Sequence, residues 1–524
     1  MHSRIYGFLL IIIAISCNPP EASESLQVQG TIADSAMVVS AHPLATEVGL
    51  KILHKGGNAV DAAIAVQFAL AVVYPVAGNI GGGGFMIYRD KDGNTDALDF
   101  REAAPLAAHR DMYLDKNGDV IENLSTLGHL AAGIPGTVDG MVEAHKKYGS
   151  MPWEELVQPA IDLASKGFTL TKNEAEGLNE NYTDFLAYNT TADQEWITDQ
   201  WKEGDSIQWP DLAKTLTLIR DNQREGFYAG ETAQLLIAEM HRGKGIITFE
   251  DLENYHASWR TPVIGQYKKY KVISMPPPSS GGIALMQLLY MMEDYPLKEW
   301  GFHSPKSIHY MAEAKKRVYA DRATHLGDPN FHLVPQKELL NKKYLKTRMK
   351  SVNDNKSTPS DSISSGLFTP YESEETTHYS IVDAQGNAVS ITTTLNGSYG
   401  SKVRVAGAGF FLNNEMDDFS IKPGTPNMYG LVGGEANAIA PFKRMLSSMT
   451  PTILEKDNEL FMVVGTPGGS TIITSVFQAI INVTEHDMSM QGAVNAGRFH
   501  DQWRPDLLFI ERNAVDKNAI ENLN

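Results

Sequence analysis

The tract from residue 377 to 396, "THYSIVDAQGNAVSITTTLN", constrains the fold of this chain more than any other. Two segments rich in β-branched residues flank a three-residue loop that ends in Gly386, a pattern typical of an antiparallel hairpin. A loop of this length predicts a register in which Thr376 faces Thr394, and directly opposed side chains lie about 5 Å apart. A slip of one residue would turn one strand's side chains to the other face, so the register is a hypothesis.

Thr376 stands where a polar, Ser-rich and acidic linker, residues 357–375, meets the first strand of this hairpin. A threonine hydroxyl is a poor nucleophile unless a base lies beside it. If the peptide bond after Glu375 is cut, the freed α-amine of Thr376 lies next to its own Oγ and can act as that base. This amine titrates near pH 8, so about a tenth of it is neutral at pH 7. The linker therefore predicts a cleavage site, and Thr376 a nucleophile that cleavage activates.

The rest of the chain predicts a mixture of helices and antiparallel strands. The stretch "HPLATEVGLKILHKGGNAVDAAIAVQFALAVV" has the spacing of two helices, the second capped by Asn58 and apolar all round. A glycine run, residues 81–84, precedes a second hairpin and matches no nucleotide-binding motif, so we interpret it as tight backbone packing. Residues 105–350 read as mostly helical, and "ELFMVVGTPGGSTIITSVFQ" as a strand, a glycine turn and a helix.

The first residues, "MHSRIYGFLLIIIAISC", predict export from the cytoplasm. The apolar run is too short to span a bilayer and fits a signal peptide over residues 1–16. Cys17, the only cysteine, follows small residues as in a bacterial lipoprotein signal, so we expect lipidation at Cys17 and a periplasmic or cell-envelope location. An ordinary secretory signal that ends near a cysteine is the alternative. A single cysteine excludes a disulfide within the chain.

Composition and missing motifs narrow the classes of function. A formal net charge of -18 disfavours nucleic acid and anionic membrane surfaces as partners, so we expect membrane contact only through a lipid anchor. The zinc motif H-E-x-x-H and the nucleophile elbow G-x-S-x-G are both missing, and the histidines lack metal-ligand spacing. We therefore expect neither a metal nor a cofactor, and we interpret His378 as a strand residue rather than a base.

Several long motifs, in order, resemble the γ-glutamyltransferases, also called glutathione hydrolases, of the N-terminal-nucleophile hydrolase superfamily. They are "GGNAVDAAIA", "DFREAAP", "GIPGTVDG", the hairpin tract, "NNEMDDFS", "YGLVGGEANAIAPFKRMLSSMTPTI" and "GTPGGSTIITSVFQ". The resemblance covers nearly the whole mature chain. It implies an α+β fold, an αββα sandwich in which two stacked antiparallel-rich sheets lie between helical layers, formed by both fragments of a self-cleaved precursor.

The resemblance also implies the reaction. The precursor cuts itself between Glu375 and Thr376, and a large subunit (17–375) and a small subunit (376–524) stay associated as a heterodimer. Thr376 attacks the γ-glutamyl amide of glutathione or a related compound. The acyl-enzyme then passes its γ-glutamyl group to water or to the amine of an amino acid or peptide.

The family pattern assigns the remaining site residues. Thr394 is the threonine beside the nucleophile, and the N–H groups of Gly468 and Gly469 stabilise the oxyanion, with Ser470 expected to cap the following helix. The substrate α-carboxylate is assigned to Arg101, Ser447 and Ser448. The α-ammonium is assigned to Asn396, Glu415 and Asp418, with Asp417 pointing elsewhere. Tyr429 matches a lid residue.

Two departures from the family pattern stand out, and two rival functions stay open. Met445 stands where relatives have a proline, and the sequence ends at Asn524 while relatives continue for a few dozen residues, so we expect a small subunit that is short for the family. One rival is a related acylase that acts on poly-γ-glutamate or a cephalosporin side chain. The other is an unprocessed lipoprotein that only binds.

Overall fold

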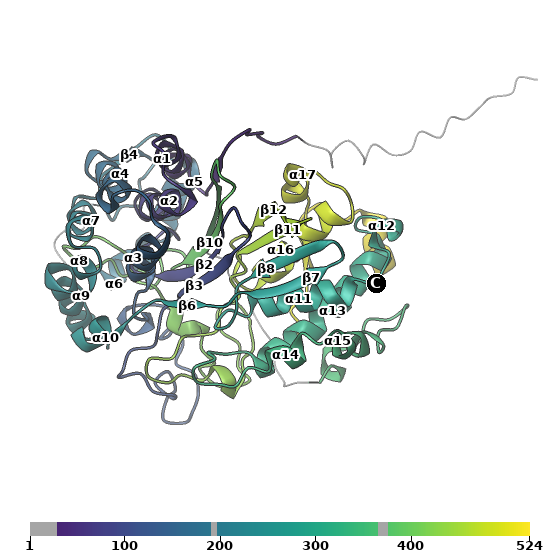
Figure 1. The fold of residues 1–524 in the computed structure, drawn as a ribbon. Helices are drawn as coiled ribbons and strands as arrows, with labels where there is room; N and C mark the ends of the chain where they lie inside the picture. Colours follow the sequence, from purple (N-terminus) through teal and green to yellow (C-terminus); the bar gives the residue numbers. More distant parts are fainter. Residues whose placement is uncertain (1–28, 190–195, 365–375, 524) are drawn as a thin grey trace, which may run out of the picture.

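In the computed structural model, which describes residues 29–189, 196–364 and 376–523, two stacked sheets lie between two layers of helices (Figure 1). Glu375 and Cys17 lie outside the described residues. The layered arrangement confirms the αββα sandwich predicted from the motifs.

The first sheet has six strands, all antiparallel, in the order β1-β9-β10-β2-β3-β6. Its strands are β1 (Met37–Val39), β9 (Thr377–Val382), β10 (Ala388–Thr394), β2 (Gly83–Arg89), β3 (Thr95–Phe100) and β6 (Ser258–Arg260). The second sheet, also antiparallel, has the order β12-β11-β8-β7. Its strands are β12 (Glu459–Val464), β11 (Thr452–Lys456), β8 (Tyr270–Ser274) and β7 (Val263–Tyr267).

The two helical layers divide along the sequence. The first, which covers the six-stranded sheet, contains α1 (Pro43–His54), α2 (Ala59–Val73), α3 (Thr137–Tyr148), α4 (Trp153–Lys166), α5 (Lys172–Glu180), α6 (Tyr182–Tyr188), α7 (Pro210–Asn222), α8 (Glu225–Tyr228), α9 (Gly230–Gly243) and α10 (Phe249–Asn254). The second layer contains α11 (Gly281–Met292), α12 (Leu297–Trp300), α13 (Pro305–His325), α14 (Gln336–Leu339), α15 (Lys342–Met349), α16 (Ile472–Thr484), α17 (Met490–Asn495) and α18 (Lys517–Leu523). No helix among the described residues is long and apolar enough to cross a membrane.

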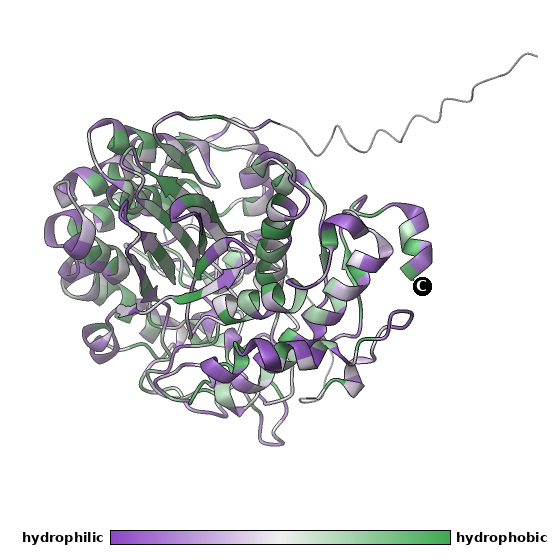
Figure 2. Ribbon diagram, turned by 45° about the vertical axis from the view of Figure 1, so that its right-hand side comes forward, coloured by the Kyte–Doolittle hydropathy of each residue, from purple (hydrophilic) through white to green (hydrophobic). Residues whose placement is uncertain are grey.

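Both faces of the six-stranded sheet are buried, and each face belongs to a different core. Met86 and Tyr88 of β2 pack into the core under the first helical layer, while Phe85 and Ile87 pack into the core between the sheets and the second layer. Successive strand residues point to opposite faces, so one strand supplies both cores. Hydrophobic residues accordingly concentrate in the strands and the helices beside them, and hydrophilic residues on the outer helices (Figure 2).

The predicted hairpin register is confirmed. The pairs run from Ala388 opposite Val382 to Thr393 opposite Thr377, and Gly386 has the left-handed φ of 88° that the loop requires. Thr376 lies one residue beyond the last pair. Because β10 also pairs along its length with β2, it is held on both sides and its end is fixed within the sheet.

The glycine run is also confirmed as tight packing, and it lies beside the end of β10. A Cβ on Gly82 would lie 2.1 Å from the carbonyl oxygen of Thr394, and one on Gly81 would lie 2.1 Å from the carbonyl oxygen of Phe411. No side chain larger than hydrogen fits at that distance. The glycines therefore let the backbone before β2 pass directly against the last residue of β10.

Two sequence expectations were incomplete or wrong. The segment expected to be mostly helical also contributes β6, β7 and β8, so it supplies half of the second sheet. The helix after the glycine turn begins at Ile472 with Thr471 as N-cap, and a short 3-10 turn, η7 (Gly469–Thr471), precedes it. Ser470 lies inside that turn, so its prediction as the cap is wrong: the tight turn moves the first helical residue further along.

Candidate active site

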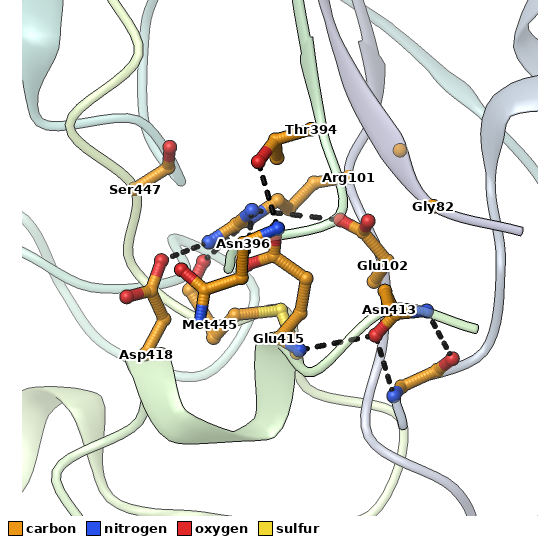
Figure 3. Close-up of polar contacts among 12 residues, drawn as sticks. Gly82, Arg101, Glu102, Thr394, Asn396, Asn413, Glu415, Asp418, Met445 and Ser447 are labelled. Carbon is orange, nitrogen blue, oxygen red and sulfur yellow. Dashed lines mark hydrogen bonds and ion pairs between the residues drawn. The ribbon is translucent and has the colours of Figure 1, made fainter. Parts of the chain in front are cut away.

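The two threonines of the hairpin end at one pocket. Thr376 and Thr394 are both buried, at 6% and 3% exposure, and both line a pocket with about 280 Å³ of space not filled by atoms, open solvent included. Thr394 Oγ1 accepts a hydrogen bond of 2.8 Å from the N–H of Asn396, which fixes that hydroxyl at the end of β10 (Figure 3).

Nearly all residues singled out in the sequence meet at this pocket, although they come from five separate parts of the chain. The predicted residues that line it are Arg101, Thr376, Thr394, Asn396, Glu415, Asp418, Tyr429, Ser447, Ser448 and Gly469. Gly468 directly precedes Gly469. Leu431, Met449 and Ile472 complete the lining and were not predicted.

Arg101 is the central charge of the pocket, and it is already paired. Its Nη1 lies 2.6 Å from Glu415 Oε2, and its Nη2 donates to Asp418 Oδ2 (Figure 3). Its Nε donates to the carbonyl oxygen of Met445 at 3.4 Å. Burial opposes the charge on Arg101, but Glu415 and Asp418 outweigh burial and hold the pKa of the guanidinium above its usual value.

A third carboxylate, Glu102, belongs to this cluster and was not predicted as a site residue. It lies 3.5 Å from Arg101 Nη1 and is fully buried. Burial raises the pKa of Glu102 to about 7, and burial likewise raises the pKa of Glu415 and of Asp418. Three carboxylates around one guanidinium give this side of the pocket an excess of negative charge once they ionise, which suits a cationic group.

Glu415 and Asp418 belong to a 3-10 turn, η5 (Glu415–Asp418), that is anchored beneath the pocket. Asn413 fixes its start, because its Oδ1 accepts from the N–H of Glu415 (Figure 3). The same Oδ1 accepts from the N–H of Gly133, and Asn413 Nδ2 donates to Gly81 O at 2.8 Å. Asp417 points away from the pocket, as predicted, although the segment is a turn and not extended.

Asp417 instead holds the loop that covers the pocket. Its carboxylate accepts from Ser125 Oγ and from the N–H of Met428, both at 2.8 Å. The next residue of that loop, Tyr429, is buried at 3% exposure, and its hydroxyl donates to the carbonyl oxygen of Asn396. The loop therefore closes over the pocket in this structure, with the Tyr429 ring at its inner surface.

The Ser447–Ser448 turn forms the opposite wall. Ser447 Oγ accepts from the N–H of Met449 at 3.1 Å, and Ser448 Oγ accepts from Arg322 Nη2 at 3.1 Å. Ser280 holds the turn from behind, because its N–H and its hydroxyl both donate to Ser447 O. Arg322 and Ser280 were missed from the sequence, since neither lies in a motif with a recognisable chemical pattern.

The glycine turn before α16 contributes backbone to the pocket. Gly468 and Gly469 have φ of 124° and 46°, conformations that favour glycine. A Cβ on Gly469 would lie 2.6 Å from the Tyr429 ring, so the covering loop and this turn are in direct contact. In the described ranges, no three His, Cys, Asp or Glu side chains are grouped so that they could hold a metal ion.

His378 lies on β9, as the sequence predicted. Its two ring nitrogens lie 3.0 Å from Thr392 Oγ1 and Ser380 Oγ, and burial lowers its pKa to about 3. The ring is therefore neutral and packed between strands, outside the lining of the pocket.

Comparison with known proteins gives a consistent result. A family model described as Gamma-glutamyltranspeptidase matches residues 45–524. The chain is 48% identical to the glutathione hydrolase proenzyme of Escherichia coli (strain K12), across 92% of this chain and 83% of that protein.

Two solved structures resemble this one. The γ-glutamyltranspeptidase of Helicobacter pylori is 45% identical with a TM-score of 0.62, and the match covers 66% of this chain and 99% of that chain. The cephalosporin acylase of Bacillus halodurans is 25% identical with a TM-score of 0.83, and the match covers 96% and 90%.

The raised pKa of Glu102 predicts a pH-dependent stability. A carboxyl group whose pKa rises from 4.5 to about 7 on folding binds more protons in the folded state. The free energy of unfolding therefore falls as pH rises from about 4.5 to about 7, by up to roughly 3 kcal/mol for this group. We expect the free energy of unfolding of Glu102→Gln to change much less between pH 5 and pH 8 than that of the wild type, as measured by urea unfolding at the two pH values.

Glu435→Gln is the matched control, because Glu435 pairs with Arg110 at the surface, where its side chain is 70% exposed. It should follow the wild type at both pH values. Equal pH dependence in the Glu102 variant and the wild type would contradict the assignment.

Proposed function

The chain belongs to the gamma-glutamyltranspeptidase family, and on this premise we propose that it is a self-processing γ-glutamyltransferase that hydrolyses glutathione and related γ-glutamyl amides. The observation that carries the proposal is the pocket that both hairpin threonines share with a paired arginine, an acidic turn and a serine turn. Those groups match the charges of a γ-glutamyl group, which carries an α-carboxylate and an α-ammonium.

Cleavage between Glu375 and Thr376 would give subunits 17–375 and 376–524. The sheet order supports an assembly that survives the cut. In the first sheet β9 and β10 of the small subunit lie between β1 and β2 of the large one, and in the second sheet β11 pairs with β8. Each sheet therefore contains strands from both sides of the cut.

Thr376 would act through its own freed α-amine. The amine takes the proton as Oγ attacks the γ-carbonyl carbon, and the oxyanion that forms accepts hydrogen bonds from the N–H groups of Gly468 and Gly469. The amine returns the proton to the leaving nitrogen, and a γ-glutamyl ester of Thr376 remains. Water or the amine of an amino acid or peptide then attacks this ester in the reverse sequence. Thr394, fixed by the N–H of Asn396, would support the nucleophile from the neighbouring strand.

Substrate recognition would divide between the two walls of the pocket. We assign the α-carboxylate to Arg101, Ser447 and Ser448, and the α-ammonium to Asn396, Glu415 and Asp418. Tyr429 would cover the bound γ-glutamyl group and exclude water other than the attacking molecule.

A second candidate is acylase activity on an amide without an α-ammonium, which is favoured by the structural likeness to a cephalosporin acylase. The acidic side of the pocket argues against it, because three buried carboxylates share the single guanidinium of Arg101 and a further cation would balance them.

Localisation follows from the first residues. We propose that residues 1–16 direct export, and that Cys17 becomes the lipidated first residue of the mature protein. The enzyme would then be anchored at the cell envelope, facing the periplasm.

Thr376→Ala tests processing and catalysis together. We expect two fragments on denaturing electrophoresis of the wild type, with the smaller one beginning at Thr376, and one uncut chain of the variant. Hydrolysis of L-γ-glutamyl-p-nitroanilide should fall by about 10³-fold or more, as for other lost nucleophiles. Thr377→Ser, one residue along and on the other face of β9, is the control and should still be cut. A cut Thr376→Ala chain would refute self-processing.

A matched pair of substrates separates the two candidate activities. Glutaryl-p-nitroanilide differs from the γ-glutamyl anilide only in lacking the α-ammonium group, and it keeps the carboxylate. We expect kcat/KM for the γ-glutamyl anilide to be higher by about 10²-fold, since a buried charge pair contributes roughly 3 kcal/mol. A preference for the glutaryl anilide would favour the acylase.

Cys17→Ala tests the anchor. We expect the wild type to sediment with membranes and to incorporate labelled palmitate, and the variant to lose both properties with kcat unchanged. A wild type that stays soluble without label would leave the secretory signal as the correct interpretation.

A further inference from the structure

Arg322 of α13 lies behind the serine turn and is 4% exposed. Its Nε donates to Ser280 Oγ at 2.9 Å and its Nη2 donates to Ser448 Oγ at 3.1 Å. Within the described ranges, no carboxylate lies within 4.0 Å of its guanidinium nitrogens. Arg317 on the same helix is different, because its Nη1 lies 2.6 Å from Glu313.

Burying a guanidinium without a carboxylate is energetically unfavourable, because only neutral hydrogen-bond acceptors offset the loss of its hydration. The charges that act on Arg322 include two from the pocket, Asp418 and Arg101. Arg322 therefore leaves a positive charge behind the Ser447–Ser448 wall that an anion in the pocket would balance.

Arg101 alone does not provide the positive charge that an anion in the pocket would need. Glu415 and Asp418 already pair with its two terminal nitrogens, and Glu102 lies 3.5 Å away. A carboxylate that enters the pocket would meet a guanidinium whose charge is compensated. The additional attraction has to come from another cation, and Arg322 contacts the same wall.

Arg322 also sets the direction of the Ser448 hydroxyl. Ser448 Oγ accepts from Arg322, and Ser447 Oγ accepts from the N–H of Met449, so each hydroxyl keeps one hydrogen to donate. Among the described residues no acceptor takes either hydrogen. Both serines line the pocket, so a bound anion is the natural acceptor. Ser280 also links Arg322 to Ser447, because its hydroxyl accepts from Arg322 Nε and donates to Ser447 O.

We propose that Arg322 is a positioning residue that makes the Ser447–Ser448 wall a site for the substrate's free α-carboxylate, by directing the Ser448 hydroxyl hydrogen into the pocket and supplying a positive charge behind the wall. The inference rests on the proposed function, and it deepens that function by naming what selects an α-carboxylate over an α-carboxamide.

The test compares Arg322→Met and Arg322→Lys with wild type on L-γ-glutamyl-p-nitroanilide, with L-glutamate and its α-carboxamide, isoglutamine, as competitive inhibitors. For Arg322→Met we expect KM and the glutamate Ki to rise about 10- to 100-fold, the range for hydrogen bonds to charged groups. kcat should change less than about threefold, and so should the isoglutamine Ki, because an amide gains little from a buried cation. Arg322→Lys should recover part of the loss, since it keeps the charge but not the fork of donors.

A structural role predicts a different result. Loss of packing would lower kcat, raise both inhibition constants together and lower the unfolding temperature. Arg317→Lys is the matched control on the same helix and should leave the ratio of the two inhibition constants unchanged. Equal rises for glutamate and isoglutamine in Arg322→Met would overturn the proposal.

A double-mutant cycle with Ser448→Ala gives an independent measure. If Arg322 acts through Ser448, the effect of Arg322→Met on KM should shrink to about a third or less in the Ser448→Ala background. Full additivity would overturn this route. A different result would refute the proposed function itself: a wild type that is cut into two fragments but hydrolyses no γ-glutamyl amide. If the wild type is active and the Arg322 variants have its KM and inhibition constants, only the role of Arg322 is refuted.

Discussion

The antiparallel pairing of β10 with β9 on one side and β2 on the other determines where the two threonines of the pocket lie. Strand register changes only in steps of one residue, and each step reverses the face of a side chain. The pairing therefore brings Thr376 and Thr394 to one end of the sheet. Asp383 secures the other end of the hairpin, because its carboxylate accepts from the N–H of Ala59 at the start of α2 and from Asn387. Gly82 completes the arrangement by letting the neighbouring backbone pass against Thr394.

The charges of the pocket form two walls of opposite character around one arginine. On one side three buried carboxylates share Arg101, and burial raises the pKa of each of them. On the other side two serine hydroxyls are backed by Arg322, which has only neutral acceptors. Neither wall has its charges fully paired by neighbouring side chains, and a zwitterion held between the two walls would balance both. Hydrogen bonds from Glu415 N–H to Asn413 and from Ser280 to Ser447 O hold the two walls in place.

Short sequence patterns predicted those structural features that depend on neighbouring residues in the chain. The hairpin register followed from loop length, the start of α2 from the capping residue Asn58, and the close approach at Gly82 from the glycine run. The family resemblance supplied the α+β sandwich and the residues that meet at the pocket. Long-range packing was less visible: β7 and β8 looked like helical connections because their partner β11 lies far along the chain. Arg322 and Glu102 acquire their importance only from what surrounds them in space, and η7 moved the helix start away from Ser470.

The alternation of strands from either side of residue 376 has a consequence for the lifetime of the cut protein. A single chain brings β1, β9, β10 and β2 together as tethered neighbours, so their first assembly is a unimolecular event. Once the link is severed, unfolding releases two separate polypeptides. Rebuilding the sheets then requires a bimolecular encounter, because the pairs β1–β9, β10–β2 and β11–β8 each take one strand from either chain. Persistence of the cut form would then depend on how slowly it opens rather than on an equilibrium with its unfolded state. A protein cut in this way would then be kinetically rather than thermodynamically stable.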